Sequence, residues 1–398
     1  MLDSKVIHVL IVGGGTGGIT VAARLRRSNE NFKVTIIEPL EEHYYQPFWT
    51  LVGGGAATKQ ETVRPMKDVI PSGVEWIKDK VVEFFPEQNK VKLQYSSEPI
   101  SYDYLVVSPG IQLDWGKVEG LKDSLGINGV CSNYSFETVD FTWEAIRNTK
   151  SGNAIFTFPN TPIKCGGAPQ KIMWLAEEYF RKNGVRDNIN VQFVAPGNAI
   201  FGVERYRIAL EKLVKERNII THFHSHLIKI DKEKNIAYFK DVHSGEAFEK
   251  EYSMIHVTPP QSSPDFIKSS PLSNSDGWVD VDKHSTQHNK YPNIFSLGDA
   301  SSLPNAKTGA SIRKQAPILV KNLIAHLHSS PLTGSYNGYA SCPIVTGYSS
   351  LILAEFKYDG IPCESFPFDQ AKPRWTMFLL KKYLLPLIYW WGMLKGRM

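Results

Sequence analysis

The start of the chain carries the pattern that most restricts the fold. Residues 6–12 form a short apolar run, residues 19–27 have a helical pattern, and residues 33–37 form a second apolar run. Between the first run and the helix stand Gly13, Gly14, Gly15, Gly17 and Gly18. Glu38 ends the second run, 20 residues beyond the last of these glycines. A strand, a glycine turn, a helix, a strand and an acid within about 30 residues predict a dinucleotide-binding unit.

Each part of this pattern has a role in holding a dinucleotide. Gly13 makes the tight turn, Gly15 lets the backbone approach a pyrophosphate, and Gly18 allows the helix to pack closely on the strand. The pyrophosphate lies at the positive end of the helix, and the Glu38 carboxylate accepts hydrogen bonds from a ribose. We therefore expect an ADP-containing dinucleotide. The simpler alternative is a cluster of loop glycines.

The rest of the chain repeats this alternation of strands and helices. Strands are predicted at residues 104–107, 153–158, 190–195, 255–258 and 294–297, with helices near 170–181 and 206–217. Such alternation predicts an α/β protein with parallel sheets. The 398 residues are enough for two or three domains, and an apolar fraction of 42% excludes a disordered chain.

Charge and cysteine content exclude several classes of protein. A formal net charge of +5 does not favour a nucleic-acid partner. Four cysteines without a CxxC pair are too few for a secreted disulfide scaffold and predict no metal site. No apolar run reaches the about 18 residues of a membrane-spanning helix. No signal peptide is visible, so the protein stays where it is made, or a targeting segment has been trimmed.

A second block indicates which dinucleotide is bound. Residues 294–300 form a short apolar strand that ends in Gly298-Asp299. This block resembles the second FAD signature of flavoproteins with two dinucleotide-binding domains, in which the aspartate binds the ribityl chain. Residues 104–110, which end in Pro109-Gly110, resemble the connecting strand of those proteins. We therefore expect FAD.

A second nucleotide site, for NAD(P)H, is not expected. We take residues 191–195 as the equivalent strand of the second domain, and Pro196 follows it where a glycine motif would stand. Proline removes an N–H donor at the turn, the next helix begins late, and no acid follows at the right distance. Reduction of the flavin by NADH is therefore disfavoured, and the protein needs another electron donor.

Two of the four cysteines are candidates for the site at which the electron donor reacts. Cys165 follows a predicted strand and immediately precedes a helix, with Lys164 beside it. A helix N-terminus and a cation both favour the reactive thiolate. Cys342 lies in a predicted loop 177 positions later, unlike the CxxxxC of disulfide reductases. Cys131 and Cys363 are expected to be inert.

Several blocks together produce a specific resemblance. They are His43-Tyr44-Tyr45-Gln46-Pro47, the segment around Cys165, Val257-Thr258-Pro259-Pro260, Leu297-Gly298-Asp299 and residues 339–348. With them the chain resembles, over nearly its whole length, the sulfide:quinone oxidoreductases, in the branch that includes the mitochondrial enzymes.

The resemblance implies two Rossmann-like three-layer domains and a C-terminal membrane-associating region. The FAD-binding domain would take residues 1–110 and 280–335. Residues 111–279 would form the second domain, without a functional NAD site. Residues 336–398 would hold the second redox cysteine, the quinone site and the membrane anchor.

The resemblance also implies an activity. Sulfide is oxidised to sulfane sulfur, and two electrons pass through FAD to ubiquinone or another membrane quinone. Cys165 and Cys342 match the redox pair of the family, which carries a disulfide or trisulfide beside the flavin. Hydrosulfide would attack Cys342, which then carries the persulfide, while Cys165 faces the flavin. The sulfur would pass to a thiol, sulfite or cyanide, or grow into polysulfide, and Lys164 would stabilise anionic sulfur near Cys165.

The cofactor contacts follow from the same resemblance. Glu38, Gln46, Asp299 and Lys307 fall on FAD-contacting positions. The other residues expected to bind the cofactor are the five glycines of the turn at 13–18, Val82, Pro109, Gly110 and Gly298. Bacterial relatives often use a third cysteine, some of them to attach FAD covalently. Neither Cys131 nor Cys363 occupies such a place, so we expect non-covalent FAD.

The segment after Phe366 is basic, aromatic and apolar, with Pro386 inside the apolar run 383–394. It is too short to span a membrane and is typical of a segment that lies in the headgroup region of a bilayer. The alternative is a pair of helices docked on the core. Tyr348, Phe356 and Phe366 are candidates for lining a quinone path.

Two other functions stay open at this point. A type II NADH:quinone oxidoreductase shares the fold and the membrane habit, but it needs an intact second glycine motif and no cysteine pair. The flavoprotein subunit of a flavocytochrome c sulfide dehydrogenase feeds a cytochrome and needs no lipid anchor. The leading interpretation places the protein peripherally on a bacterial plasma membrane, or on the mitochondrial inner membrane if a transit peptide has been trimmed.

Two smaller features are assigned no chemistry. His222, His224 and His226 alternate on a predicted strand and are expected to share one solvated face rather than to bind a metal. The run Gly53-Gly54-Gly55 is expected to be a flexible loop near the flavin.

Overall fold

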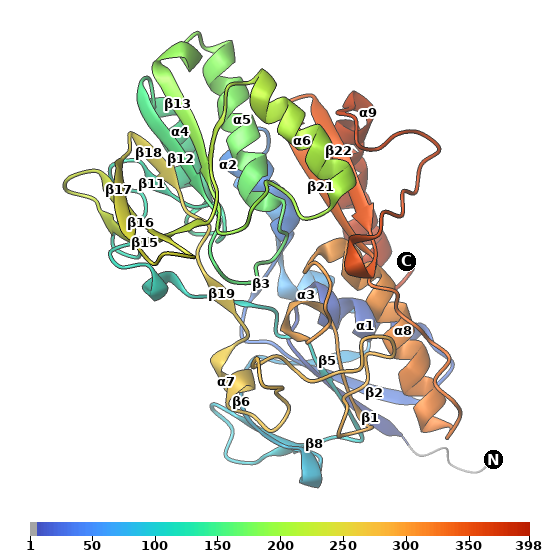
Figure 1. Ribbon diagram of the computed structural model, residues 1–398. Coiled ribbons are helices and arrows are strands. Elements are labelled where there is room, and N and C mark those ends of the chain that lie inside the picture. The colour runs from blue at the N-terminus through green and yellow to red at the C-terminus, as the bar shows by residue number, and fades with distance from the viewer. Residues whose placement is uncertain (1–5) are drawn as a thin grey trace.

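The computed structural model describes residues 6–398 and arranges them in two lobes, with the C-terminal segment lying along both (Figure 1). Each lobe contains a five-stranded parallel sheet flanked by helices. The mixed α/β class expected from the sequence is confirmed. Within the described residues no helix combines the length and the apolar character needed to cross a bilayer.

The sheet of the first lobe has the strand order β20-β9-β1-β2-β5, and every neighbouring pair is parallel. Its strands are β1 (Ile7–Val12), β2 (Phe32–Ile37), β5 (Val74–Ile77), β9 (Tyr104–Val107) and β20 (Ile294–Ser296). Helices α1 (Thr16–Arg27) and α8 (Gly309–Leu327) pack on one face. The other face packs on the antiparallel strands β6 (Val81–Phe85), β7 (Lys90–Leu93) and β8 (Ile100–Ser101).

Strand β1 shows why these layers form. Val9 and Ile11 pack in the core that contains α1 and α8, whereas Leu10 and Val12 pack in the core that contains β6 and β7. A strand covered on both faces has no solvated side, so successive positions must be apolar. The continuous apolar run at the start of the sequence is therefore the mark of the middle layer.

The second lobe repeats the plan. Its parallel sheet has the order β11-β18-β12-β13-β14, with the strands β11 (Val130–Cys131), β12 (Gly152–Thr157), β13 (Ile189–Val194), β14 (Ile220–His222) and β18 (Met254–His256). One face packs with α4 (Val139–Asn148), α5 (Ala168–Lys182) and α6 (Glu204–Glu216). The other packs on the antiparallel strands β15 (Ser225–Asp231), β16 (Ile236–Asp241) and β17 (Ala247–Glu251).

The remaining elements are short, apart from the C-terminal segment. Short pieces are β3 (Glu42–Tyr44), α2 (Trp49–Gly53), β4 (Val63–Pro65), α3 (Met66–Val69), β10 (Gln112–Leu113), β19 (Gln261–Ser262) and α7 (Asp265–Lys268). The C-terminal segment begins with the antiparallel hairpin of β21 (Ala340–Gly347) and β22 (Ser350–Phe356), which packs on α5. It ends in a helical stretch of α9 (Trp375–Leu379), a π-helical turn (Leu380–Leu384), α10 (Leu385–Leu387) and a second π-helical turn (Ile388–Met393).

The strand order identifies equivalent elements of the two lobes. Strand β1 lies between β9 and β2, and β12 lies in the same way between β18 and β13. The counterpart of β1 is therefore β12, and the counterpart of the glycine turn is the loop 158–167 that leads into α5. The expectation that residues 191–195 form the equivalent strand was wrong, because β13 corresponds to β2.

Two local expectations were also wrong. His222 ends β14, β15 begins at Ser225, and His224 between them is left-handed with a φ of 59°, so the histidines do not share one strand face. Gly53 ends helix α2, and a Cβ on Gly54 would lie 2.5 Å from a side-chain carbon of Leu175 in α5. The glycine run thus allows close packing between helices and is not a flexible loop.

Candidate active site

The glycine turn after β1 is shaped by close backbone contacts. Gly13 has a φ of +99°, and a Cβ there would lie 2.5 Å from the Ser108 carbonyl oxygen. A Cβ on Gly18 would lie 1.9 Å from the Gly13 carbonyl oxygen, so α1 can pack on β1 only with glycine at this position. Gly15 differs, because no protein atom lies within 4 Å of its Cβ position. The turn therefore leaves open space at the N-terminus of α1, where an anion binds.

Glu38 closes this turn from the end of β2. Its carboxylate accepts hydrogen bonds from the backbone N–H of Gly14 at 2.8 Å and of Leu40 at 2.9 Å. Burial raises the pKa of Glu38, although the two N–H donors act in the opposite direction. The acid predicted from its spacing thus stands beside the turn, as a ribose contact requires.

A cavity of about 570 Å³ opens from the glycine turn and passes between the lobes. The predicted cofactor residues that line it are Gly14, Gly15, Gly17, Glu38, Gln46, Pro109, Gly110, Gly298, Asp299 and Lys307. Of the two redox cysteines, only Cys165 is on this wall. Gly13 and Gly18 do not line the cavity, but their close backbone contacts fix the shape of the turn. The turn, the helix end and the carboxylate fit an ADP-containing cofactor.

Val82 does not join this group. It lies on β6 with 38% of its surface exposed, and the cavity wall does not include it. Its neighbours Val81 and Phe84 point into the core under the sheet. A register shift between Val81 and Glu83 interrupts the alternation of β6, so Val82 is directed to the outside although Phe84 is buried.

Lys307 ties the second lobe to the first beside Asp299. Its ammonium donates to the carbonyl oxygens of Asp299 at 2.8 Å and Ser301 at 3.1 Å. Its own carbonyl oxygen accepts a 2.8 Å hydrogen bond from the Cys165 N–H. Burial lowers the pKa of Lys307 to about 8 and raises that of Asp299. The loop that carries Cys165 is thus anchored to the cofactor side of the cavity.

The two redox cysteines meet although 177 residues separate them. Their Sγ atoms are 3.5 Å apart, and both are free thiols. Cys342 lies inside strand β21 and not in a loop as expected from the sequence, and it is 2% exposed. Cys165 is left-handed with a φ of 56°. A Cβ on Gly167 would lie 2.3 Å from the Cys342 sulfur, so glycine is required for the loop before α5 to approach strand β21.

The electrostatics of the pair are asymmetric. The hydrogen bond from Cys342 and the charge of Lys171, whose Nζ is 3.1 Å from Cys165 Sγ, hold the pKa of Cys165 well below the usual thiol value. The same hydrogen bond, burial and the Cys165 charge raise the pKa of Cys342 well above that value. Cys165 is therefore the thiolate of the pair, and Cys342 is its protonated partner.

Lys164 has a different contact from the one expected. Its ammonium donates to Gln46 Oε1 at 2.7 Å and to the Tyr134 carbonyl oxygen at 3.3 Å. The lysine at the sulfur atoms is instead Lys171, one helical turn into α5. The assignment of Lys164 to the thiolate was wrong, because Gln46 and Tyr134 hold its ammonium while Lys171 contacts the Cys165 sulfur.

The hairpin β21–β22 separates two environments. Ser341, Pro343, Leu353 and Glu355 line the cavity, whereas Cys342, Ile344, Ile352 and Ala354 pack toward the core of the second lobe. Alternation along paired strands explains this division. Phe366 also lines the cavity, but Tyr348 and Phe356, which we expected along a quinone path, do not.

The C-terminal helical stretch docks on the glycine turn. A 2.6 Å hydrogen bond joins Tyr389 Oη to His43 Nε2, and a 2.9 Å bond joins it to Thr16 Oγ1. Burial lowers the pKa of His43 to about 4, so the ring is neutral. Its Nδ1 contacts the Gly14 carbonyl oxygen at 3.1 Å and must donate there, which leaves Nε2 as the acceptor for Tyr389.

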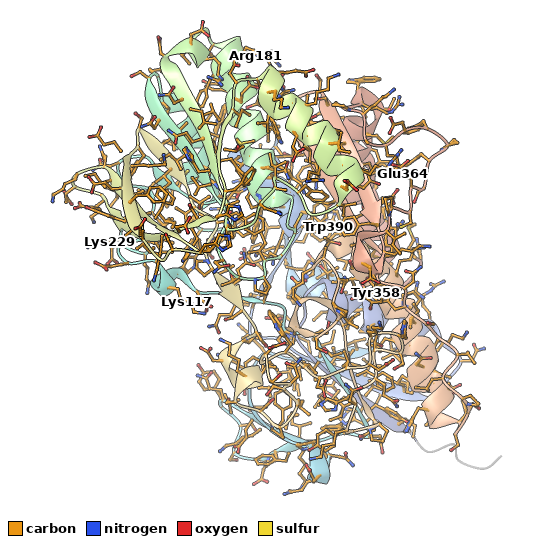
Figure 2. The ribbon with its side chains drawn as sticks, viewed as in Figure 1. Lys117, Arg181, Lys229, Tyr358, Glu364 and Trp390 are labelled. Carbon is orange, nitrogen blue, oxygen red and sulfur yellow. The ribbon has the colours of Figure 1, made fainter. Side chains whose placement is uncertain are left out.

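The same stretch has an inner and an outer side. Trp390 is 4% exposed and lies in the interior of the molecule (Figure 2). The ammonium of Lys381, 2% exposed, donates to the Pro47 carbonyl oxygen at 2.7 Å and lies near the cysteine pair; burial lowers its pKa to about 7. On the outer side, large apolar residues are exposed by about half: Trp375, Tyr383, Leu387 and Trp391. One face is thus docked on the core, as one alternative expected, and the other is open.

Comparison with known proteins identifies the family. The model of the pyridine nucleotide-disulphide oxidoreductase family matches residues 7–138. The chain is 48% identical over 390 residues to the mitochondrial sulfide:quinone oxidoreductase of Mus musculus, across 98% of this chain and 86% of that protein. The protein of the same name from Dictyostelium discoideum is 49% identical over 396 residues, across 99% and 87%. This chain belongs to the sulfide:quinone oxidoreductase family.

A solved structure agrees in fold. The X-ray structure of the sulfide:quinone oxidoreductase from Aquifex aeolicus matches with a TM-score of 0.84 at 20% identity, covering 98% of this chain and 92% of that chain. As a member of the sulfide:quinone oxidoreductase family, the protein is an oxidoreductase with a flavin cofactor.

Sequence reasoning missed two buried lysines: Lys171, which contacts the Cys165 sulfur, and Lys381, which lies near the pair. Lys171 follows Gln170 and precedes the apolar run 172–176 in α5, and it is 3% exposed. A lysine on the buried side of a helix needs a partner, so the helical pattern carried a usable signal. Lys381 carried none, because its position depends on how the C-terminal stretch docks.

Proposed function

We propose that this chain is an FAD-dependent enzyme that oxidises sulfide through Cys165 and Cys342 and passes the electrons to a membrane quinone. One observation carries the proposal: two thiols 3.5 Å apart, with Lys171 at 3.1 Å from one sulfur, at the edge of the cavity that begins at the glycine turn. Thiols at this separation can close to a disulfide with small movements, because a disulfide needs about 2.05 Å between the sulfurs. FAD supplies the two-electron acceptor for that oxidation.

The proposed reaction follows from thiol–disulfide exchange. Hydrosulfide attacks Cys342 in the oxidised pair, and the sulfur–sulfur bond breaks to leave a persulfide on Cys342 and a thiolate on Cys165. The outer sulfur then passes to a small nucleophile, a thiol, sulfite or cyanide, or to a growing polysulfide. The two cysteines that remain reform their bond, and the electron pair released goes to the flavin. Lys171 stabilises the Cys165 thiolate from the breaking of the disulfide until the bond reforms.

Other contacts support non-covalent FAD. Among the described residues, Cys165 is the only cysteine on the cavity wall. Burial raises the pKa of Cys131 to about 12, so this thiol stays protonated. Neither it nor Cys363 is placed for attachment to a cofactor in this cavity.

The outer side of the C-terminal helical stretch supports binding to a membrane surface. Its exposed aromatic and aliphatic residues, Trp375, Tyr383, Leu387 and Trp391, are joined by the cations Lys382, Lys395 and Arg397. Aromatic rings settle at the bilayer interface, and basic residues are attracted to anionic lipid. The curated relatives named above are mitochondrial proteins, which favours the mitochondrial inner membrane over a bacterial plasma membrane.

The decisive experiment follows the flavin spectrum under anaerobic conditions. Sulfide should bleach the wild-type flavin, and a short-chain quinone should restore its absorbance. Cys165→Ser and Cys342→Ser should each abolish bleaching while the flavin stays bound. Cys363→Ser, a half-buried thiol away from the pair, is the matched control and should bleach at the wild-type rate. Rapid bleaching of either redox-cysteine variant by sulfide would refute the relay.

Membrane binding is tested on the outer side alone. Leu387→Ser combined with Trp391→Ser should reduce sedimentation with anionic vesicles without loss of flavin, since neither side chain is in the docked face. Equal sedimentation of this variant and the wild type would contradict the anchor.

A further inference from the structure

A buried carboxylate in the cavity wall has no role in the relay described above. Glu355 is 3% exposed and lies on β22, on the face of the hairpin that lines the cavity. It is paired in register with Ser341, next to Cys342 on the neighbouring strand. A carboxylate is rarely this buried without a paired charge. Within the part of the chain that the structure describes, no lysine or arginine forms an ion pair with it.

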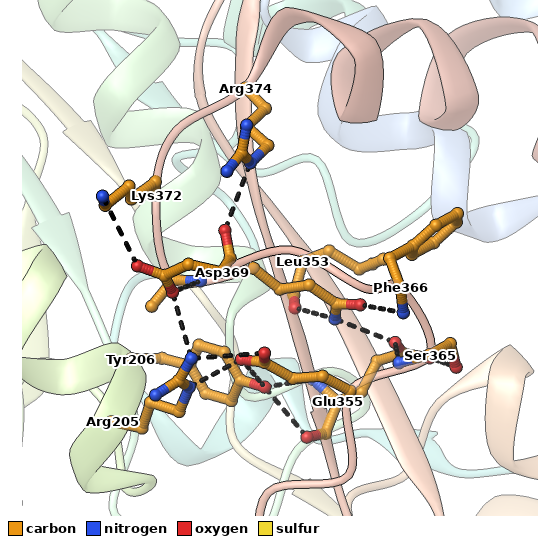
Figure 3. A network of polar contacts seen from close by, with 12 residues as sticks. Arg205, Tyr206, Leu353, Glu355, Ser365, Phe366, Asp369, Lys372 and Arg374 are labelled. Carbon is orange, nitrogen blue, oxygen red and sulfur yellow. Dashed lines mark hydrogen bonds and ion pairs between the residues drawn. The ribbon is translucent and has the colours of Figure 1, made fainter.

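Neutral groups hold this carboxylate instead (Figure 3). Oε1 accepts hydrogen bonds from Tyr339 Oη at 2.5 Å and from Ser365 Oγ at 2.9 Å. Oε2 accepts from the Ser365 N–H and from Gln370 Nε2, both at 2.9 Å. Hydroxyl groups can donate or accept, so Ser365 and Tyr339 can each exchange a proton with Glu355. Both hydroxyl groups are therefore placed to donate to the carboxylate or to accept from the carboxyl form.

Ser365 connects this buried carboxylate to water. Unlike Glu355, Ser365 is an exposed residue, and it also lines the cavity. A single hydroxyl group thus stands between solvent and the carboxylate. Gln370 fixes the arrangement, because its side chain also bonds the Leu353 carbonyl oxygen and the Phe366 N–H.

The surroundings of Glu355 indicate which molecule could take a proton from it. Leu353 and Phe366, joined to it through Gln370, line the cavity with Leu380 and Leu384. This wall suits an apolar ring. A quinone takes up two electrons and two protons to become a quinol, and in the proposed function the electrons come from the reduced flavin. An apolar wall supplies no protons, so a polar group in it must do so.

We propose that Glu355 delivers protons from solvent, through Ser365, to the quinone as it is reduced. A proton moves from the Glu355 carboxyl to a quinone oxygen, and Ser365 passes a replacement from water to the carboxylate left behind. This inference rests on the proposed function, because it needs a quinone in the cavity.

The test separates the two halves of the reaction in the flavin-loaded protein. Sulfide reduces the flavin anaerobically, and a short-chain ubiquinone is then mixed in while flavin absorbance is followed. Glu355→Gln should be reduced by sulfide at the wild-type rate but reoxidised about 10²-fold more slowly, the usual effect of removing a proton donor. Glu355→Asp, which keeps the carboxyl, should recover most of the rate. Glu364→Gln, the neighbouring carboxylate paired with Arg205, is the matched control and should behave as wild type.

Further measurements keep the outcome decisive. Reoxidation of the wild type should be slower in deuterated water, because the quinone takes up protons in this step. Recovery of the rate by Glu355→Asp but not by Glu355→Gln assigns that proton to the carboxyl, since a merely structural role would not depend on its acidity. If Glu355→Gln loses its flavin, the test compares Ser365→Ala with Ser365→Thr. Alanine, which removes the hydroxyl group, should slow turnover with quinone by about tenfold, whereas threonine, which keeps it, should not. Reoxidation of Glu355→Gln at the wild-type rate overturns the relay. Failure of sulfide to reduce even the wild-type flavin overturns the proposed function instead.

Discussion

The two lobes use the same strand–loop–helix unit for different chemistry. In the first, β1 leads to α1 through residues 13–15, and no side chain caps the helix. In the second, β12 leads to α5 through the longer loop 158–167, which carries Cys165. The N-terminus of a helix favours negative charge in both cases. In the first lobe we infer that the N-terminus of α1 faces the phosphates of the cofactor. In the second lobe the N-terminus of α5 lies next to the Cys165 thiolate.

The residue that follows the second strand of each unit also differs between the lobes. Glu38 follows β2 and closes the glycine turn. Residues Val12 and Ile37 are partners in the first sheet, as Thr157 and Val194 are in the second, so Ala195 takes the place of Glu38. An alanine cannot bind a ribose. Under the proposed function, the same position in the fold binds a nucleotide in the first lobe and holds a redox cysteine in the second.

Substitution at the two loops offers the largest test of this contrast. Gly15 and Gly166 both have open space at their Cβ positions, so alanine is tolerated by the fold at each. Gly15→Ala should weaken flavin binding by at least about tenfold, or 1.4 kcal/mol, because the methyl group occupies the approach to the pyrophosphate. Gly166→Ala should retain flavin. The measurement is the flavin-to-protein ratio after dialysis, with thermal unfolding of the apoproteins as the check on folding; equal retention by both variants would contradict the assignment.

The second test concerns the thiolate. Because Lys171 helps to lower the pKa of Cys165, the thiolate should persist as the pH falls below the ordinary thiol pKa of about 8.5, and it should be lost only when the pH falls through the lowered value. Lys171→Met should raise that pKa and slow alkylation of Cys165 at pH 7 by about tenfold.

Lys164→Met is the matched control for that measurement, because Lys164 contacts Gln46 and not the sulfur. Its alkylation rate should stay close to that of the wild type. If Lys164→Met slowed alkylation more than Lys171→Met, the electrostatic assignment of the two lysines would be reversed.

The smallest expected effect is with NADH. The loop 158–167 has no GxGxxG and Ala195 replaces the acid, so NADH should leave the flavin oxidised over the time in which sulfide bleaches it. Anaerobic spectra after each addition provide the measurement. Bleaching by NADH at the rate seen with sulfide would break the contrast between the lobes and support a type II NADH:quinone oxidoreductase.

Much of the first lobe could be predicted because its signals are local. The apolar run of β1, the glycines and Glu38 lie close together in sequence, and each has one physical reason to be there. The second lobe misled us at residues 191–195, since a strand followed by proline looked like a damaged nucleotide site. Only the pairing order of the strands shows that β12 is the equivalent of β1.

The sequence by itself determined the α/β class, the dinucleotide turn and the two cysteines worth testing, because periodicity, turn geometry and residue chemistry are properties of short segments. The tertiary structure decided which groups surround those cysteines. Lys171, Lys381 and Glu355 come from α5, the C-terminal helical stretch and β22, and Val82 is turned outward at an irregularity in the pairing of β6 with β7. The pattern of α5 marks Lys171 as a buried lysine, but which group it meets depends, like the other contacts, on how distant elements pack.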